Sequence, residues 1–275
     1  MVGIICDLSF KNHWLQESYY MSIKNIFDDV KIVFSENDLI GLNLLFICDE
    51  HFMPNKLIWM NDKFINKCNS QNIQVVIFNN EKILNSFFPW NEENQRNVNK
   101  FKNKIQFVYD VNDAKILNCD INKTYMSKYY LHNLKLEETH KKDKIVFVGN
   151  YKNNTYGRRK ILLDKIVNKF DVDIIDTDHN RSIKEYLNLI NQYKYVLSPL
   201  GNGDFLPMRF YETLYVGSIP IQECTNDMIY YMTEEMDKSI FFESIDKLIL
   251  KDIKLPNQYY MEDFMIYIFS KYKIL

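Results

Sequence analysis

Short apolar runs alternate with amphipathic segments along most of the chain, and this alternation constrains the fold more than any other feature. Short runs rich in Val, Ile, Leu and Phe are typical of buried strands, whereas apolar residues at every third or fourth position are typical of helices. Strands that alternate with helices pair in parallel through right-handed crossovers, so the sequence predicts open α/β sheets. The expected strands are Val2–Cys6, Val30–Phe34, Asn43–Cys48, Ile73–Phe78, Ile105–Tyr109, Lys144–Val148, Val172–Ile175 and Tyr193–Leu197.

The chain is long enough for two domains, because 275 residues suit two domains of about 130 residues each. The periodic pattern is lost between Asn118 and Lys144, and the residues from His140 to Lys144 are strongly polar. We therefore expect a linker near residues 133–143, an N-terminal domain at 1–135 and a C-terminal domain at 143–255.

The composition argues against several classes of protein. The 34 basic and 36 acidic side chains nearly cancel, whereas a general nucleic-acid binder carries a basic excess. The five cysteines lack a C-x-x-C spacing, which argues against a disulfide framework or a zinc site. The sequence shows neither a signal-peptide pattern nor an apolar stretch of membrane-spanning length, so we expect a soluble, cytoplasmic protein without a transmembrane segment.

The clearest chemical signal lies in the segment YKYVLSPLGNGDFLPMRFYETLYVGSIPIQ, residues 193–222. An apolar strand is followed by a loop of turn-forming residues, then by a helix that Pro207 begins and Gly217 ends, then by another strand. Free backbone N–H groups and the positive end of a helix dipole make such a strand, loop and helix start an anion site, and phosphate is the natural ligand. The candidate loop residues are Ser198, Gly201, Asn202 and Gly203.

Three charged residues accompany this loop. Arg209 lies in the first turn of the helix, where its guanidinium can take two phosphate oxygens, and Glu212 follows at i+3, where it can accept ribose hydroxyls. Asp204 lies eight positions before Glu212. A purely structural alternative remains, in which the glycines allow a tight turn, Asp204 caps the helix, and Arg209 and Glu212 form an exposed ion pair.

The pattern S-P-x-G-N-G-D-x4-R-x2-E-x-L-x2-G-x-I-P-I resembles the donor-binding segment of GT-B glycosyltransferases, most closely the exostosin-like group (glycosyltransferase family 47-like). The resemblance spans about 25 residues, from Ser198 to Ile221. It implies two Rossmann-like α/β domains facing a cleft and a C-terminal helix at 256–275 that packs back on the first domain. It also implies that Glu212 binds the nucleotide ribose and Arg209 the diphosphate. Asp204 stands where other GT-B families have the first Glu of an E-x7-E motif, which leaves its role open.

A second resemblance lies at the start of the C-terminal half. The strand KIVFV runs into Gly149 and Asn150, and a helix begins with Arg158 and Arg159. This order is similar to the opening of a GT-B donor domain, which implies that Arg158 or Arg159 reaches the same diphosphate as Arg209.

The two resemblances imply transfer of a sugar from a nucleotide-diphosphate donor, with UDP-sugars favoured, to a hydroxyl of a glycan or glycoconjugate acceptor. The reaction is expected to invert the anomeric centre and to need no cofactor and no divalent metal. An inverting transferase needs a base from the first domain, and Asp7, His13 and Asp49 are the candidates by position. Asp7, Asp49, Asn79 and Asp110 all follow predicted strands, and ligands of open parallel sheets bind at that edge.

Other functions stay open at this stage. Asp176 and Asp178 form a D-x-D after a strand, which resembles the metal site of GT-A transferases. A nucleotide-binding module without catalysis would keep Arg209 and Glu212 but need no base. A periplasmic-type binding protein is disfavoured because no signal peptide is visible, and hydride transfer is disfavoured because the first strand is not followed by G-x-G-x-x-G.

Overall fold

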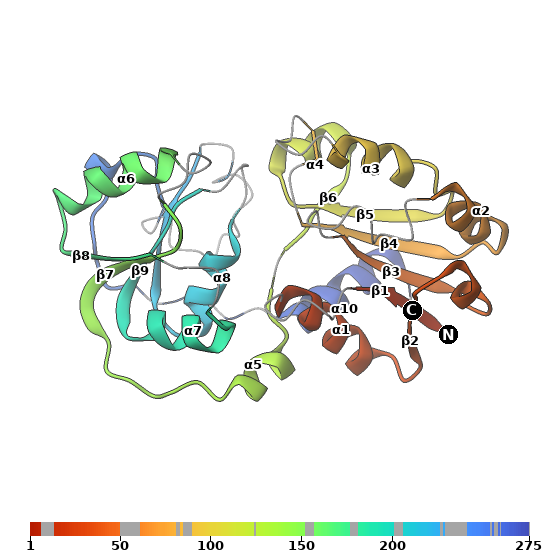
Figure 1. Cartoon of the computed structure of the whole chain (residues 1–275), viewed down its shortest axis with the longest axis horizontal. Helices are drawn as coiled ribbons and strands as arrows, with labels where there is room; N and C mark the ends of the chain where they lie inside the picture. Colours follow the sequence, from red (N-terminus) through yellow and green to blue (C-terminus); the bar gives the residue numbers. More distant parts are fainter. Residues whose placement is uncertain are drawn as a thin grey trace. The chain divides into compact units, whose positions relative to one another are not determined.

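The computed structural model describes residues 1–6, 14–49, 61–80, 83–84, 90–123, 125–151, 157–176, 181–200, 206–225, 228, 241–253, 255, 258 and 260–274. The chain divides into two compact units (Figure 1). The first unit comprises Met1–Tyr130 with Tyr260–Leu275, and the second comprises Leu131–Tyr259. The division falls inside helix α5 (Lys128–Leu134), a few residues before the boundary expected at 135. None of the described helices is long and apolar enough to cross a bilayer.

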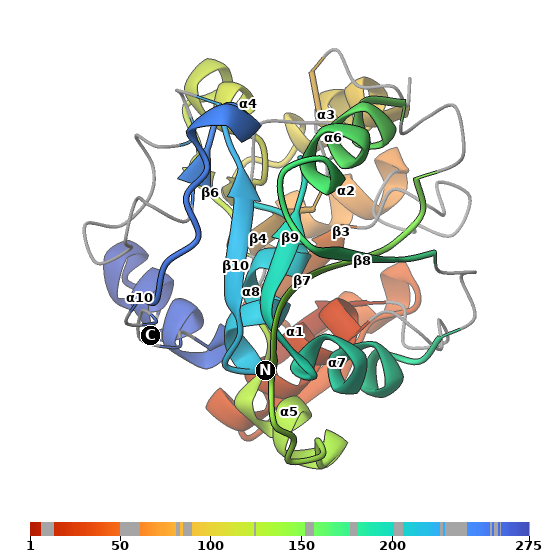
Figure 2. The same ribbon diagram turned by 90° about the vertical axis from the view of Figure 1, so that its left-hand side faces the viewer.

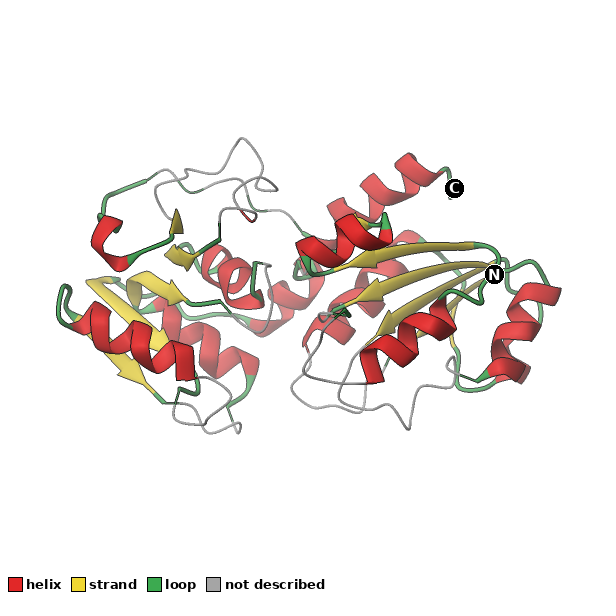
Figure 3. Ribbon diagram, turned by 90° about the horizontal axis from the view of Figure 1, so that it is seen from above, coloured by secondary structure: helices red, strands yellow, loops and turns green. Residues whose placement is uncertain are grey.

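The first unit contains a parallel sheet of six strands in the order β2-β1-β3-β4-β5-β6. Strands of this sheet are the yellow arrows on the right of Figure 3. The strands are β1 (Val2–Ile5), β2 (Val30–Ile32), β3 (Leu44–Asp49), β4 (Gln74–Asn79), β5 (Lys104–Val108) and β6 (Asp120–Ile121). Besides α5, the helices are α1 (Trp14–Ile26), the 3-10 helix η1 (Glu36–Leu39), α2 (Asp62–Ser70), α3 (Trp90–Val98), α4 (Val111–Leu117) and α10 (Met261–Tyr272).

Helices cover both faces of this sheet, as the figure shows for α2 and α3 on one side and α1 and α10 on the other (Figure 1). Successive strand residues point to opposite faces. Leu45, Ile47, Val75 and Ile77 form a core with residues of α2 and α3. The alternate residues Phe46, Phe78 and Phe107 form a row of rings on the other face, where Tyr19, Phe264 and Phe269 pack against them.

The last helix belongs to the first unit and is tied to it by a buried carboxylate. Glu262 is 4% exposed and accepts hydrogen bonds from the hydroxyls of Ser22 and Ser127 and, at 3.1 Å, from the backbone N–H of Lys128. The backbone N–H of Met261 donates to the carbonyl of Met126 at 3.0 Å. Polar contacts therefore fix the start of α10, while its rings complete the core.

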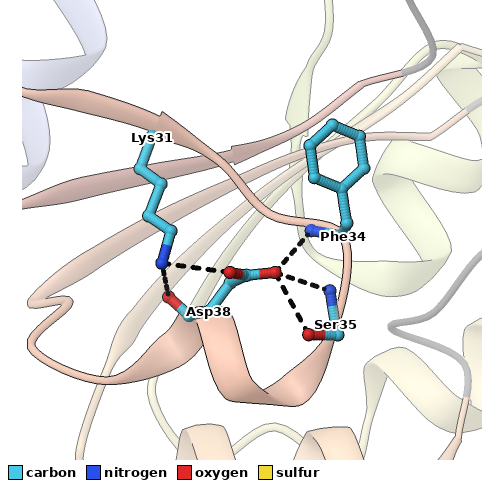
Figure 4. A network of polar contacts seen from close by, with 4 residues as sticks. All are labelled: Lys31, Phe34, Ser35 and Asp38. Atoms are coloured by element: carbon cyan, nitrogen blue, oxygen red, sulfur yellow. Dashed lines mark hydrogen bonds and ion pairs between the residues drawn. The ribbon is translucent and has the colours of Figure 1, made fainter.

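The turn after β2 is organised by Asp38, whose carboxylate accepts the backbone N–H groups of Phe34 and Ser35 at 3.1 and 3.0 Å (Figure 4). The Ser35 hydroxyl and the Lys31 ammonium complete the set. The hydrogen bond from Lys31, followed by that from the Phe34 backbone, lowers the pKa of Asp38. This compact turn replaces the end of the strand expected at 30–34, so β2 stops at Ile32.

The second unit contains a parallel sheet of five strands in the order β11-β10-β9-β7-β8. Figure 2 shows β10, β9, β7 and β8 of this sheet. Its strands are β7 (Lys142–Val148), β8 (Val172–Ile175), β9 (Tyr193–Ser198), β10 (Ile219–Glu223) and β11 (Phe241–Phe242). Its helices are α6 (Gly157–Val167), α7 (Ile183–Asn191), α8 (Met208–Tyr215) and the 3-10 helix η6 (Ile245–Lys247). Helix α6 covers one face of the sheet, and α7 and α8 cover the other (Figure 1).

The two units share one topology, because both sheets place their first five strands in the order 2-1-3-4-5. This is a doubly wound Rossmann-like arrangement, and the predicted fold class is confirmed. Such sheets have a switch point, where chain connections leave in opposite directions and a crevice opens beyond the carboxyl ends of two neighbouring strands. The switch points lie between β1 and β3 in the first unit and between β7 and β9 in the second.

Several local predictions were wrong or incomplete. The spacing of apolar residues predicts a helix at Asn91–Lys102, whereas α3 ends at Val98, four residues earlier. The elements α4, β6 and α5 were not predicted. Asp110 lies at the sheet edge but serves as the N-cap of α4, accepting the backbone N–H groups of Asn112 and Asp113 at 2.9 and 3.1 Å. Asn79 is buried and accepts a hydrogen bond from Gln106 at 2.7 Å. Apolar spacing also predicts helices at 82–88 and 226–232, and most of both ranges lies outside the described residues.

The Lys141 ammonium ties together the ends of two helices in the second unit. It donates to the carbonyl and side-chain oxygens of Asn191, at 2.9 and 2.8 Å, and to Val216 O and Ser218 Oγ, both at 2.8 Å. Asn191 is the last residue of α7 and Val216 is the C-cap of α8, so a cation there also offsets two helix dipoles.

We expect Lys141→Met to lower the free energy of unfolding by about 1–3 kcal/mol, because it leaves these acceptors, including those of the buried residues Val216 and Ser218, without their donor. Urea denaturation monitored by circular dichroism measures the change. Lys142→Met is the matched control, since the neighbouring exposed ammonium lies 4.8 Å from the Tyr193 ring, a contact worth about 0.5–1 kcal/mol. Equal losses in the two variants would show that the Lys141 contacts contribute nothing specific.

Candidate functional site

The candidate site lies at the switch point of the second sheet. β7 and β9 run side by side and are followed by Gly149 and Pro199, so the residues after them reach the same edge. The sequence placed Gly149, Asn150 and Ser198 in the site, and the topology brings these strand ends together. Helix α8 delivers Arg209 to the same place, because its guanidinium contacts the end of β7.

Arg209 is held by backbone and ring contacts. Its Nη2 donates to the carbonyl oxygen of Val148 at 2.9 Å, and its guanidinium carbon lies 5.1 Å from the centroid of the Phe147 ring. Its buried Nε atom has no hydrogen-bond partner. A guanidinium fixed on a ring face keeps its planar fork in one orientation, which suits bidentate binding of an anion. These contacts favour a functional role over the exposed ion pair considered from the sequence.

Gly149 makes room for this arginine. A Cβ atom built at Gly149 lies 2.7 Å from Arg209 Nη2 and 3.2 Å from the tip of the Phe147 ring, and the backbone φ is +157°. Distances below 3.0 Å require a neighbour to shift, and here that neighbour is the guanidinium itself. The glycine is therefore required by the position of Arg209 and not only by the turn.

We expect Gly149→Ala to displace the Arg209 guanidinium and to weaken anion binding at this edge by about tenfold, comparable to the loss of one charge-assisted hydrogen bond. Titration with inorganic pyrophosphate, followed by calorimetry, measures the affinity. Gly41→Ala is the control, because Gly41 also has a positive φ, of +79°, but lies in the first unit with open space around its Cβ. Unchanged affinity in Gly149→Ala would contradict this role.

Glu212 lies one turn after Arg209 on α8 and is 7% exposed. The Tyr186 phenol of α7 interacts with both Glu212 and Arg209, and its hydroxyl oxygen is buried. Burial first, and the charge of Glu212 second, raise the pKa of Tyr186. Tyr186 was not predicted as a site residue. Its position in the middle of an ordinary helix gives no sequence signal, and only the packing of α7 against α8 places it here.

A second arginine is anchored by a carboxylate at the end of β10. Arg158 Nη2 donates to Glu223 Oε1 at 2.8 Å, and Glu223 Oε2 accepts the backbone N–H of Leu200 at 2.9 Å. Arg159 Nη1 donates to the carbonyl of Asn150 at 3.3 Å. Both predicted arginines therefore lie near strand ends of this sheet. Glu223 was not predicted, because it lies just beyond the segment of residues 193–222. Its place at the carboxyl end of a strand was the available signal, since polar residues at that position often line a ligand site.

Two buried oxygens at this edge lack partners. Ser198 and Gln222 are opposite each other in the register of β9 and β10, and both residues are fully buried. Neither Ser198 Oγ nor Gln222 Oε1 has a hydrogen-bond partner. Such orphaned atoms are uncommon in folded proteins and indicate an environment completed by a ligand or a water molecule.

The electrostatics of the two helix starts favour an anion. Helix α6 begins Gly157-Arg158-Arg159-Lys160 and has no acidic residue in its first turn, and α8 has Arg209 in its first turn and no acid there. Helices usually place acidic side chains in the first turn, where the dipole is positive. Positive side chains at positive helix ends are mutually unfavourable until an anion binds between them.

Other predicted site residues are only partly visible. Asp7, His13, Gly201, Asn202, Gly203, Asp204 and Asp178 lie outside the described residues. Asp49 is the last residue of β3, at the switch point of the first sheet, and its side chain is outside the described part. Asp176 follows β8 and is exposed. Among the described residues, no three His, Cys, Asp or Glu side chains lie close enough together to hold a metal ion.

Comparison with known proteins finds similarity among solved structures. No family model matches the sequence, and no curated protein matches it. A crystal structure of an α1,3-fucosyltransferase is similar with a TM-score of 0.49 and 15% sequence identity, covering 90% of this chain and 75% of that chain. A likeness at this level does not assign a function, which must be argued from the residues of the chain itself.

Proposed function

We propose that the protein is a glycosyltransferase that moves a sugar from a nucleotide-diphosphate sugar to a hydroxyl of a glycan acceptor. The observation that carries this proposal is the guanidinium of Arg209, fixed at the switch point by Val148 O and the Phe147 ring, with Glu212 one turn further along the same helix. An oriented cation and a carboxylate on one helix match the diphosphate and the ribose hydroxyls of one ligand.

In the proposed reaction the nucleoside diphosphate is the leaving group. Negative charge builds on its phosphate oxygens as the glycosidic bond breaks, and donors already aimed at that position stabilise the transition state. Arg209, Arg158 and the N–H groups at the start of α8 would supply this stabilisation without a metal ion. The order Arg, Glu, Gly, Pro resembles the exostosin-like donor segment, which favours a UDP-sugar.

The acceptor and the base are assigned to the first unit. Its switch point lies between β1 and β3, and Asp7, His13 and Asp49 follow or end these strands. In open parallel sheets ligands bind at this position. One of the three would remove the proton of the acceptor hydroxyl while the hydroxyl oxygen attacks the anomeric carbon and the nucleoside diphosphate leaves. This single displacement would invert the configuration at the anomeric carbon.

The proposal is tested by thermal unfolding of the wild type and Glu212→Ala with UDP, GDP, dTDP, CMP and NAD, each with and without Mn²⁺. A ligand that binds the folded state raises the unfolding midpoint by mass action. We expect one nucleoside diphosphate to raise the midpoint of the wild type, with or without Mn²⁺, and to lose this effect in Glu212→Ala. If no nucleotide shifts the wild type, or if NAD alone does, the transferase proposal fails.

A further inference from the structure

Glu223 joins two segments that both lead into the candidate site. It ends β10, and its side chain is 8% exposed. One carboxylate oxygen accepts from the first turn of α6, through Arg158, and the other accepts from the backbone just after β9, through Leu200 N–H. The carboxylate thus has one partner on each side of the switch point.

We propose that Glu223 is a positioning residue for donor binding, acting through Arg158. The inference rests on the proposed function, since it assumes that the anion bound at this edge is the diphosphate of the donor. The Arg158 side chain is 62% exposed, and one of its five N–H donors is used by Glu223. The pairing therefore fixes one N–H of the guanidinium and leaves the rest of this largely exposed side chain outside the contact.

The negative charge of Glu223 allows a positioning role to be distinguished from direct repulsion between this carboxylate and the bound anion. A carboxylate close to a diphosphate site repels the ligand, so its neutralisation alone should strengthen binding. A positioning role predicts weaker binding. Without Glu223 the Arg158 side chain is mobile in the free protein, so anion binding must then order it at a cost in conformational entropy. The sign of the change in affinity therefore separates the two explanations.

Glu223→Gln is the appropriate substitution. The amide oxygen of glutamine still accepts the Leu200 N–H, while the amide nitrogen then faces the Arg158 guanidinium as a second donor, so this one contact is broken. We expect the dissociation constant for the nucleoside diphosphate that stabilises the wild type to rise about tenfold, comparable to the loss of one charge-assisted hydrogen bond. Calorimetric titration well below the unfolding midpoint of each variant measures binding to the folded protein.

Two further variants give the test its controls. Asp171→Asn removes the same charge at the amino ends of the strands, away from the candidate site. Asp171 is exposed, precedes β8 and pairs with Lys144. We expect this substitution to leave the affinity unchanged. The second control is the double variant Arg158→Ala/Glu223→Gln. Because Glu223 acts through Arg158, the two losses of affinity should not add, and the double variant should bind no more weakly than Arg158→Ala.

The outcomes separate failure of the inference from failure of the function. Tighter or unchanged binding in Glu223→Gln, or additive losses in the double variant, overturns the positioning role while the proposed function stands. Absence of nucleoside diphosphate binding in the wild type overturns both. A lower unfolding midpoint in Glu223→Gln with unchanged affinity assigns Glu223 a structural role alone and also overturns the inference.

Discussion

Replacement of Arg209 by alanine is expected to weaken nucleoside diphosphate binding by about 100-fold or more, the largest effect of any single substitution in the second unit. Arg209 is oriented at the switch point by both a backbone carbonyl and a ring. In the proposed site its loss would remove two charge-assisted hydrogen bonds to phosphate, each worth about 1.5–3 kcal/mol. Calorimetric titration of the purified variant gives the dissociation constant.

Two controls make the Arg209 result specific. Arg209→Lys keeps the charge but not the planar fork, so we expect affinity between those of the wild type and Arg209→Ala. Arg96→Ala removes an exposed arginine of the same type from α3 in the first unit and should leave binding unchanged. Wild-type affinity in Arg209→Ala would mean that the ligand, if any, binds elsewhere.

The second large effect concerns stability. We expect Glu262→Ala to lower the free energy of unfolding of the first unit by about 2–4 kcal/mol, because it leaves the donors of Ser22, Ser127 and Lys128 without an acceptor in a buried environment. The variant also loosens the start of α10, whose rings pack on the sheet. Urea unfolding measured by tryptophan fluorescence reports the change, because all three tryptophans belong to the first unit.

The neighbouring residue provides the comparison. Asp263 is exposed and accepts the backbone N–H of Tyr260 at 3.1 Å, so Asp263→Ala removes an ordinary helix cap worth about 0.5–2 kcal/mol. A loss in Glu262→Ala no larger than in Asp263→Ala would show that the buried contacts of Glu262 do not hold α10 in place.

Much of the sheet could be predicted from the sequence because buried parallel strands are almost uniformly apolar. The runs at Ile73–Phe78, Val172–Ile175 and Tyr193–Leu197 correspond closely to β4, β8 and β9. Pro220 in β10 is compatible with a central strand, since β11 pairs with β10 only from Gln222 onward. The helix within the segment of residues 193–222 was also predicted, although Pro207 proves to be its N-cap and Met208 its first residue.

The site could be predicted only in part, because tertiary packing decides what a polar residue at a strand end does. Asp110 looks like an edge ligand in the sequence but caps a helix, and Asn79 is used within the core. Tyr186 and Glu223 reach the candidate site only through tertiary contacts. Tyr186 does so through the packing of α7 on α8, and Glu223 through its pairing with Arg158 of α6. Arg209 and Glu212 could be proposed because they belong to a motif with a fixed order of residue types. Hydrophobic periodicity predicts helices and strands but does not indicate which polar residues bind a ligand.

The central claim is that the carboxyl edge of the second sheet binds the diphosphate of a nucleotide-sugar, and a hydrogen-exchange footprint tests it most directly. Amide exchange would be measured with and without the nucleoside diphosphate that stabilises the wild type. The account predicts slower exchange at the end of β7, the first turn of α6 and the start of α8, with no such protection in Arg209→Ala. Protection confined to the first unit, or to the opposite edge of the second sheet, would contradict it.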